Sequence, residues 1–212
     1  MVFFAIKIGM SNANFIELET CIEHCINYCA THKSLDFVEI YEPRLVYART
    51  RFDEGVETSD KKYLVWQSAV ADETRAWKSV ASQLKMLQKE IASMGCSDYP
   101  SERIMYWDTE ILSDSVAQLL TFIDSFEEKA ELKEDVDKIK RGLSAAQSKR
   151  ILSHEKVSEY SRFSRMRSEA LGTLNATLGD FRKSMRRNLG KQSEDYNAIR
   201  WPMTLAPDER IL

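Results

Sequence analysis

Residues 61–94 read KKYLVWQSAVADETRAWKSVASQLKMLQKEIASM, a stretch without glycine or proline. Apolar side chains recur in it at a period of about 3.5 residues, as they do in supercoiled helices. These side chains are Trp66, Val70, Trp77, Val80, Leu84, Leu87, Ile91 and Met94, and Glu73 interrupts the series. The pattern predicts one long helix that packs against another helix along this seam, with both tryptophans in the core.

Three other regions have helical spacing of their apolar residues. A helix is expected over residues 15–32. A second pattern covers residues 112–143 and changes phase near Ala130, which we interpret as a bend within one long helix. The last helix is expected from about residue 153 to residue 189. Its seam consists of Val157, Tyr160, Leu171, Leu174, Leu178, Phe181 and Met185.

The segments between these helices are less regular. Residues 35–52 fit a helix, but Pro43 lacks a backbone donor, so we favour a broken helix over a hairpin. Linkers are expected at residues 52–60 and 95–102, where glycine, proline and helix-capping residues cluster. The expected fold class is all-α: a long antiparallel coiled-coil helical bundle with three long helices and a shorter N-terminal helical segment.

The composition agrees with a helical protein. The chain has 212 residues, of which 43% are hydrophobic and 30% charged, with only 7 glycines and 4 prolines. It can therefore form a sizeable core and needs few tight turns. Long helices with wide seams usually bury their remaining apolar surface against a second copy, so we expect a homodimer. We expect short helices over residues 1–59, the bundle over 60–191 and an irregular tail over 192–212.

The formal net charge of -3 hides a regional asymmetry. Residues 98–137 contain 12 acidic and 3 basic side chains, whereas residues 138–191 contain 14 basic and 4 acidic ones. Five basic residues of the last helix avoid its apolar seam and are expected to point outward: Arg162, Arg165, Lys183, Arg186 and Arg187.

These five residues are the candidate contact residues for an anionic membrane surface or for another helical protein. The acidic helix of a neighbouring copy could also meet them, and a solvated face without a partner is the further alternative. Nucleic acid is not expected as a partner, because the basic helix lacks interleaved exposed aromatic residues.

The sequence predicts no catalytic residues and no cofactor. It contains no GxxxxGK[ST], GxGxxG, GxSxG or HExxH motif. Cys21, His24, Cys25 and His32 lie on one predicted helix, which alone can offer a metal ion only an i, i+4 pair. We therefore interpret the cysteines as small buried apolar residues, with a metal site as the alternative if another helix supplied ligands. His154 is expected to be exposed at a helix start, and we do not expect an enzyme.

Three of the four cysteines, Cys21, Cys25 and Cys29, lie on one predicted helix and cannot easily bridge one another, which indicates reduced thiols in an intracellular, cytoplasmic protein. The opening MVFFAIKIGM is too short for a membrane span and lacks the features of a signal peptide. We interpret it as a short strand or a packed arm, with a membrane-dipping amphipathic segment as the alternative. Peripheral association with intracellular membranes is compatible with this location. Trp107 and Trp201 are expected to pack against helix ends.

Three stretches resemble the BAR superfamily, in its arfaptin-homology and sorting-nexin branches. RFSRMRSEALGTL (162–174) and FRKSMRRNL (181–189) are similar to the last BAR helix, and EILSDSVAQLLTFIDSF (110–126) is similar to the start of the middle helix. The resemblance covers about residues 60–201 and implies a dimeric crescent whose basic residues lie on anionic membrane. We therefore expect a non-enzymatic scaffold that senses or shapes membrane. The alternative is a soluble coiled-coil adaptor or assembly subunit.

Overall fold

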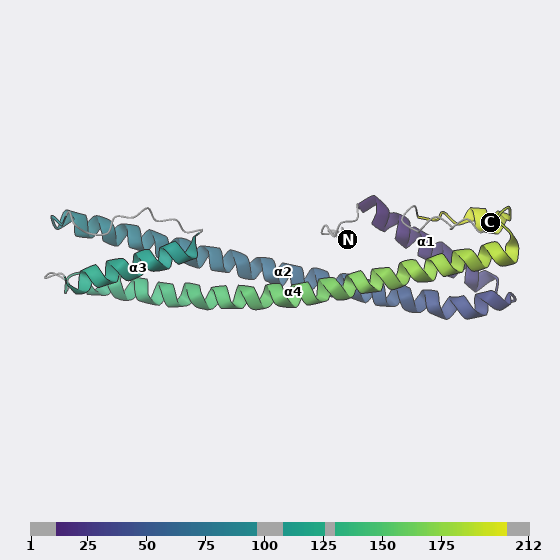
Figure 1. Cartoon of the computed structure of the whole chain (residues 1–212), viewed down its shortest axis with the longest axis horizontal. Coiled ribbons are helices and arrows are strands. Elements are labelled where there is room, and N and C mark those ends of the chain that lie inside the picture. The colour runs from purple at the N-terminus through teal and green to yellow at the C-terminus, as the bar shows by residue number, and fades with distance from the viewer. Residues whose placement is uncertain (1–11, 97–107, 126–129, 203–212) are drawn as a thin grey trace. The chain divides into compact units, whose positions relative to one another are not determined.

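The computed structural model describes residues 12–96, 108–125 and 130–202, and every regular element within them is a helix (Figure 1). The helices are α1 (Asn12–Thr31), α2 (Asp36–Ser93), α3 (Thr109–Asp124), α4 (Lys133–Leu189) and α5 (Glu194–Ala198). The all-α prediction is confirmed. None of these helices combines the length and apolar character that crossing a membrane requires. The predicted strand or arm at residues 1–10 lies outside the described residues, and so does Trp107.

The chain divides into two compact units, each with its own core. Residues 1–61 and 161–212 form the first unit, and residues 62–160 form the second. α2 and α4 contribute to both units, α1 and α5 belong to the first, and α3 belongs to the second. The division expected from the sequence, after residues 59 and 191, stays a prediction.

The first unit is built around apolar side chains from α1, the start of α2 and the end of α4. Its buried residues include Leu18, Cys21, Ile22, Cys25, Cys29, Val38, Leu45, Phe52, Leu174, Leu178, Phe181 and Met185. They recur at steps of three and four residues along α1 and α4, so one face of each helix is apolar. The predicted helix over 15–32 and the predicted seam from Leu174 to Met185 are confirmed.

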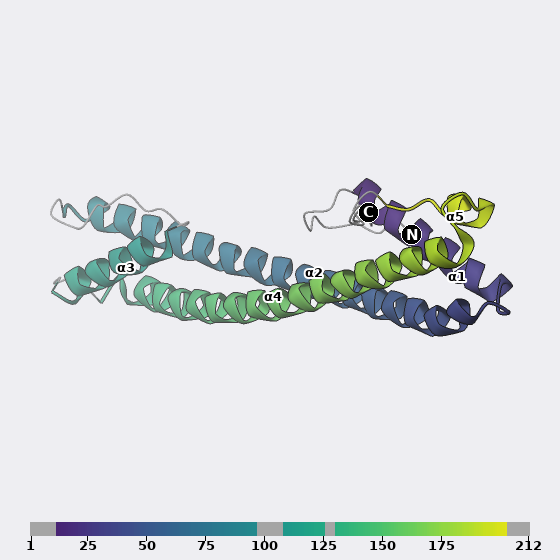
Figure 2. The ribbon, with the colours of Figure 1, turned by 45° about the vertical axis from the view of Figure 1, so that its right-hand side comes forward.

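The chain after α4 packs back onto this core, and Figure 2 shows α5 beside the end of α4. Gly190 has a positive φ of 88°, which allows the chain to leave the helix. Ser193 caps α5 by accepting a hydrogen bond of 3.1 Å from the Tyr196 amide. The Trp201 ring lies 6.5 Å from the Phe181 ring. The prediction of an irregular tail is therefore wrong for residues 194–198, while the packing role of Trp201 is confirmed.

The second unit buries one side of α2 against α3 and the first part of α4 (Figure 2). Five seam residues predicted for α2 are buried: Trp77, Val80, Leu84, Leu87 and Ile91. α3 and the start of α4 contribute Leu112, Val116, Leu119, Ile123, Leu132, Val136 and Ile139. Near the start of the seam the prediction is wrong at Val70, which is 37% exposed, because Ala69 takes the buried position. Trp66 is half-buried and stacks on Tyr160.

α2 continues through both places where a break or a linker was expected. Pro43 and Glu39 are exposed, so the carbonyl that lacks its donor remains accessible to water. Gly55 lies at a close approach of two helices, where a Cβ would stand 3.3 Å from the Cα of Arg167. The broken helix at Pro43 and the linker at 52–60 are therefore corrected to one helix of 58 residues. Its glycine permits a helix contact instead of a turn.

The predicted long third helix is in fact two separate helices. α3 ends at Asp124, with Ser125 as its C-cap, and α4 begins at Lys133. The change of phase near Ala130 therefore marks the interval between two helices and not a bend. α4 passes without a break through Ser153, where the last helix was expected to begin. Within the residues that the structure describes, the long helices are therefore two, of 58 and 57 residues, and not three shorter ones.

Candidate functional site

Four of the five predicted basic residues lie on one side of α4. Successive residues of an α-helix are rotated by about 100°, so Arg165 and Lys183 are separated by about five full turns. Arg162 and Arg187 lie within about 60° of them by the same geometry. All four side chains are exposed, and we call these four residues the basic face. Arg186, the fifth predicted residue, lies at the border of this face and is half-buried.

The basic face is neutralised only in part by residues of its own helix. Lys183 Nζ lies 3.8 Å from Asp180 Oδ1, and Glu169 is a second exposed acid on the same side. Within the described residues, no ion pair involves Arg162, Arg165 or Arg187. Basic residues in the last turn of α4 also complement the partial negative charge of a helix C-terminus. The face therefore keeps several cationic side chains available for a partner.

Arg167 is a buried charge that the sequence interpretation did not single out. It is 7% exposed, and its Nη1 donates a hydrogen bond of 3.1 Å to Asp60 Oδ1 of α2. Burial raises the pKa of Asp60, and the nearby guanidinium opposes this rise. Arg167 precedes Leu174 by seven residues and so occupies a seam position in the heptad pattern. That spacing is the sequence signal that could have identified it.

A cavity of about 320 Å³ lies beside this ion pair, between α1, α2 and α4. Its lining consists of Phe15, Glu19, Arg49, Asp53, Val56, Glu57, Asp60 and Arg167. Arg49 donates a hydrogen bond of 2.8 Å to Glu23 and also lies 3.5 Å from Asp53. Burial and the charge of Asp53 raise the pKa of Glu19, whereas Arg49 lowers it. Arg49, Asp53, Glu57, Asp60 and Arg167 each lie in an ion pair, and these pairs stabilise the junction of the three helices.

The three cysteines of α1 are buried in the core of the first unit. A hydrogen bond with Cys21, together with burial, raises the pKa of Cys25, and burial raises the pKa of Cys29 to about 11. His24 is exposed, and His32 stacks on a tyrosine ring. Within the described ranges, no group of three or more His, Cys, Asp or Glu side chains is placed to hold a metal ion. The interpretation of the cysteines as buried apolar residues is confirmed.

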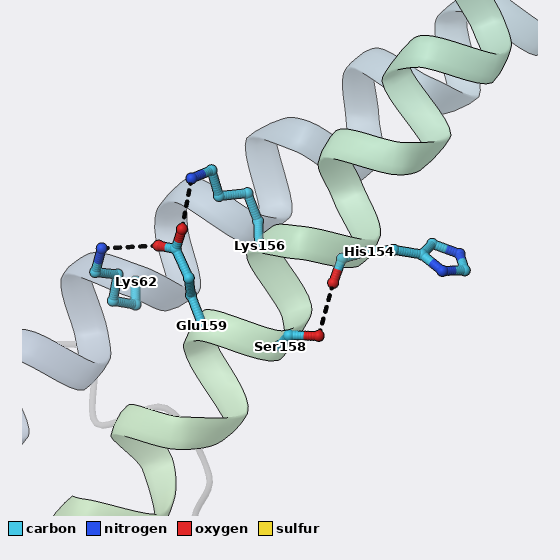
Figure 3. A network of polar contacts seen from close by, with 5 residues as sticks. All are labelled: Lys62, His154, Lys156, Ser158 and Glu159. Atoms are coloured by element: carbon cyan, nitrogen blue, oxygen red, sulfur yellow. Dashed lines mark hydrogen bonds and ion pairs between the residues drawn. The ribbon is translucent and has the colours of Figure 1, made fainter.

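Figure 3 shows a polar network on the surface of the second unit. The carboxylate of Glu159 accepts hydrogen bonds from Lys156 of α4 and Lys62 of α2, each of 2.8 Å. These two bonds lower the pKa of Glu159 to about 2. The ring of His154 points away from the network, and its carbonyl accepts a hydrogen bond of 3.0 Å from Ser158. His154 is exposed as predicted, but it lies within α4 and not at its start.

Glu73, which interrupts the predicted seam, has a partner on the opposite helix. Its carboxylate accepts a hydrogen bond from the hydroxyl of Ser153, and the serine is 4% exposed. The half-buried Glu73 of α2 therefore pairs with the buried Ser153 of α4. Because a buried polar group is costly when it is unpaired, this bond accounts for an acid within an otherwise apolar seam.

The basic face is the predicted feature that a partner can reach directly, because its side chains are exposed on one side of one helix. Arg167 and the three cysteines of α1 are buried, and the Glu73–Ser153 bond is partly buried, so these groups stabilise the units. The sequence matches no protein-family model and no curated protein, and the fold matches no solved structure.

Proposed function

We propose that the protein is a non-enzymatic helical scaffold that homodimerises and contacts anionic membrane, in the manner of BAR-like proteins that sense or shape membrane. The observation that carries the proposal is the alignment of Arg162, Arg165, Lys183 and Arg187 on one exposed side of α4. These residues extend over roughly 40 Å of helix. A basic side chain at an anionic surface contributes about 1 kcal/mol, so four that reach the surface together support reversible binding.

An antiparallel arrangement of the long helices belongs to the same proposal. Within the second unit, Lys62 of α2 bonds to Glu159 of α4. Further along α2, Gln83 lies beside Gly142, where a Cβ would be 3.0 Å from the amide oxygen. These two contacts support an arrangement in which residue numbers along α4 decrease as residue numbers along α2 increase. Two long helices that pair in this way resist bending, which suits a scaffold.

Exposed apolar side chains support homodimerisation. Leu64 of α2 is 62% exposed, and Ile151 of α4 is 63% exposed. A second copy could cover such side chains, and two-fold dimers are the commonest closed assemblies. We expect light scattering to give about twice the chain mass of 24.5 kDa. A mass equal to one chain at all concentrations would contradict this part of the proposal.

A soluble coiled-coil adaptor that binds another protein is the second candidate function. An exposed apolar strip on α2 favours it, because Ile40 and Tyr47 are 52% and 62% exposed. The exposed Pro43 lies on the same side of the helix. Such a strip could pack against the apolar face of a partner helix. Binding to lipid vesicles distinguishes this candidate from the membrane scaffold.

Co-sedimentation with vesicles tests the membrane proposal. The protein is mixed with phosphatidylcholine vesicles, and with vesicles that also contain phosphatidylserine, at low and at physiological salt. We expect binding only to the anionic vesicles and weaker binding at the higher salt concentration. Arg162→Glu/Arg165→Glu should weaken that binding by about tenfold or more.

The matched control is Lys85→Glu/Lys89→Glu, two exposed lysines of α2. It changes the net charge by the same amount and should bind as well as the wild type. Equal losses in both variants would show that net charge, and not the basic face, determines binding. No binding at low salt would leave the adaptor as the function.

A further inference from the structure

α3 carries acidic side chains on the side opposite to its core. Glu110 and Asp114 are exposed and stand four residues apart, and the exposed Asp124 lies on the same side of the helix. We call these three residues the acidic face. Like charges at this spacing repel each other. Within the described residues, neither Glu110 nor Asp114 forms an ion pair.

The basic face of α4 contains the same kind of local repulsion with the opposite sign. Arg162 and Arg165 stand three residues apart, and Lys183 and Arg187 stand four apart. Besides Glu169 and Asp180 on α4, both faces have small side chains at exposed positions between their charges. On α4, a Cβ at the exposed Gly172 would meet no atom within 4 Å. On α3, the corresponding stretch has exposed Ala117 and Thr121, so two helices could approach closely here.

We propose that the acidic face of α3 binds the basic face of α4 in a second copy of the chain. In a two-fold dimer, each copy contributes one face of each sign, so the same contact forms twice. The contact then places charges of opposite sign beside Glu110 and Asp114 of α3 and beside Arg162 and Arg165 of α4, which offsets the local repulsion on both helices. Complementary charges also determine which surfaces meet and increase the rate of association. The partner is a second copy because this chain itself carries both faces.

The contact also regulates the proposed membrane function, and this part of the inference rests on that function. Arg162 and Arg165 cannot face the acids of a second copy and lipid headgroups at the same time. Self-association therefore covers the basic face in solution, and anionic lipid competes with α3 for it. Removing the acidic face should favour membrane binding.

Charge reversal in matched pairs tests the contact between copies. Variant A is Glu110→Lys/Asp114→Lys, and variant B is Arg162→Glu/Arg165→Glu. Sedimentation equilibrium without vesicles measures self-association. We expect the dissociation constant of A alone and of B alone to rise about tenfold or more, because like charges then meet at both contacts. An equimolar mixture of A and B should regain wild-type association, because each reversed face meets a face of opposite sign.

Lys85→Glu/Lys89→Glu again serves as the control and should associate like the wild type. Recovery in the mixture also demonstrates that both variants are folded. Circular dichroism of each variant alone gives an independent check of helix content. Equal dissociation constants for the wild type, A and B would overturn the proposal. A mixture that associates no better than A or B alone would overturn it as well.

Vesicle binding separates the regulatory inference from the membrane proposal itself. Glu110→Gln/Asp114→Asn removes the acidic face and leaves the basic face intact. It should dissociate more readily in solution and bind phosphatidylserine vesicles at least as tightly as the wild type. Weaker vesicle binding by this variant would refute the regulation. If no form binds vesicles but the mixture of A and B recovers association, the membrane proposal fails and the contact between copies stands.

Discussion

Arg167 of α4 and Asp60 of α2 form an ion pair in which the arginine side chain is 8% exposed and the aspartate side chain 22% exposed. Gly55, one and a half turns earlier on α2, lets the two helix backbones approach closely at the same place. A charge removed from water is costly unless it is paired. The two residues therefore depend on each other, and the first unit depends on both.

Asp60→Ala should strongly destabilise the protein, because it removes the Asp60 carboxylate that accepts a hydrogen bond from the buried Arg167 guanidinium. We expect the free energy of unfolding in urea to fall by about 3–5 kcal/mol. Lys61→Ala is the control, because its ion pair with Glu57 is exposed on both sides, and it should change stability little. Asp60→Leu/Arg167→Met, which removes both charges, should recover most of the loss. A loss for Asp60→Ala no greater than that of the control would contradict the interpretation.

Two glycine substitutions should have opposite effects. Gly55→Ala places a Cβ 3.3 Å from the Arg167 backbone and should cost about 1–3 kcal/mol, because the helices must move apart. Gly172→Ala meets no atom within 4 Å and should stabilise α4 by about 0.5–1 kcal/mol, because alanine favours the helix. Thermal unfolding of both variants measures the difference. Equal effects would show that Gly55 is not needed for the helix contact.

Ser153→Ala should remove the hydrogen bond that the half-buried Glu73 carboxylate accepts from Ser153. We expect a loss of about 1.5–3 kcal/mol in the free energy of unfolding. Ser158→Ala, an exposed serine that bonds only within its own helix, should cost much less. Glu73→Leu/Ser153→Ala should be close to wild type in stability, because both partners become apolar. A double variant less stable than Ser153→Ala would contradict this expectation, because it would show that the two apolar residues do not replace the stabilisation by the polar pair.

Glu159 should make stability depend on pH in the acidic range. Its pKa of about 2 in the folded protein lies below the ordinary value of 4.5, so the folded state favours the ionised form. This contribution is complete above the ordinary value and is lost as the pH falls towards the folded value. The stability difference between wild type and Glu159→Gln should therefore shrink across this interval. A constant difference would contradict the low pKa.

Removal of the two donors provides the matched test for Glu159. Lys62→Met/Lys156→Met should raise the pKa of the Glu159 carboxyl towards its ordinary value, because both bonds that favour the ionised form are lost. Carboxyl chemical shifts followed by NMR during an acid titration measure this directly. Lys149→Met on the same helix is the control, because Lys149 is not a partner of Glu159, and it should leave that titration nearly unchanged.

The cysteines should differ strongly in their reaction with a thiol reagent. Cys25 and Cys29 are buried with raised pKa values, about 11 for Cys29, and the thiolate is the reactive form. Cys96 is half-exposed. Labelling of the folded protein should therefore modify Cys96 first, and mass spectrometry of the digested protein identifies the site. In Cys96→Ala, fast labelling should be absent until denaturant is added. Rapid modification of Cys29 in that variant would show that α1 detaches readily.

The helices themselves could be predicted, because the periodic spacing of apolar residues along the sequence indicates which face of a helix is buried. Five residues between Trp77 and Ile91 are buried at the predicted positions. Gly95, with a φ of 84°, ends α2 where the second linker was expected. These signals are local, since each depends on residues close in sequence.

The errors concern residues whose role depends on a distant part of the chain. Glycine is common in turns, so Gly55 taken alone predicts a turn. In the structure it lies within α2, where it allows close contact with Arg167. Arg167 has a charged side chain, and only its position in the heptad pattern suggests burial. The separation of α3 from α4 was interpreted as a bend because no glycine or proline marks it. The exposed basic residues were easier to predict, because exposure requires only that they avoid the seam.

The first unit draws its core from two parts of the chain that a ribosome makes at different times. Leu174 is synthesised 153 residues after Cys21, although both belong to one core. At roughly 5–20 residues per second, the interval is roughly 8–30 s. The core of the second unit, in contrast, lies entirely within residues 77–146. During synthesis the second unit can therefore fold first. The apolar face of α1 remains exposed until the end of α4 has been synthesised, and chaperones can bind it during that interval.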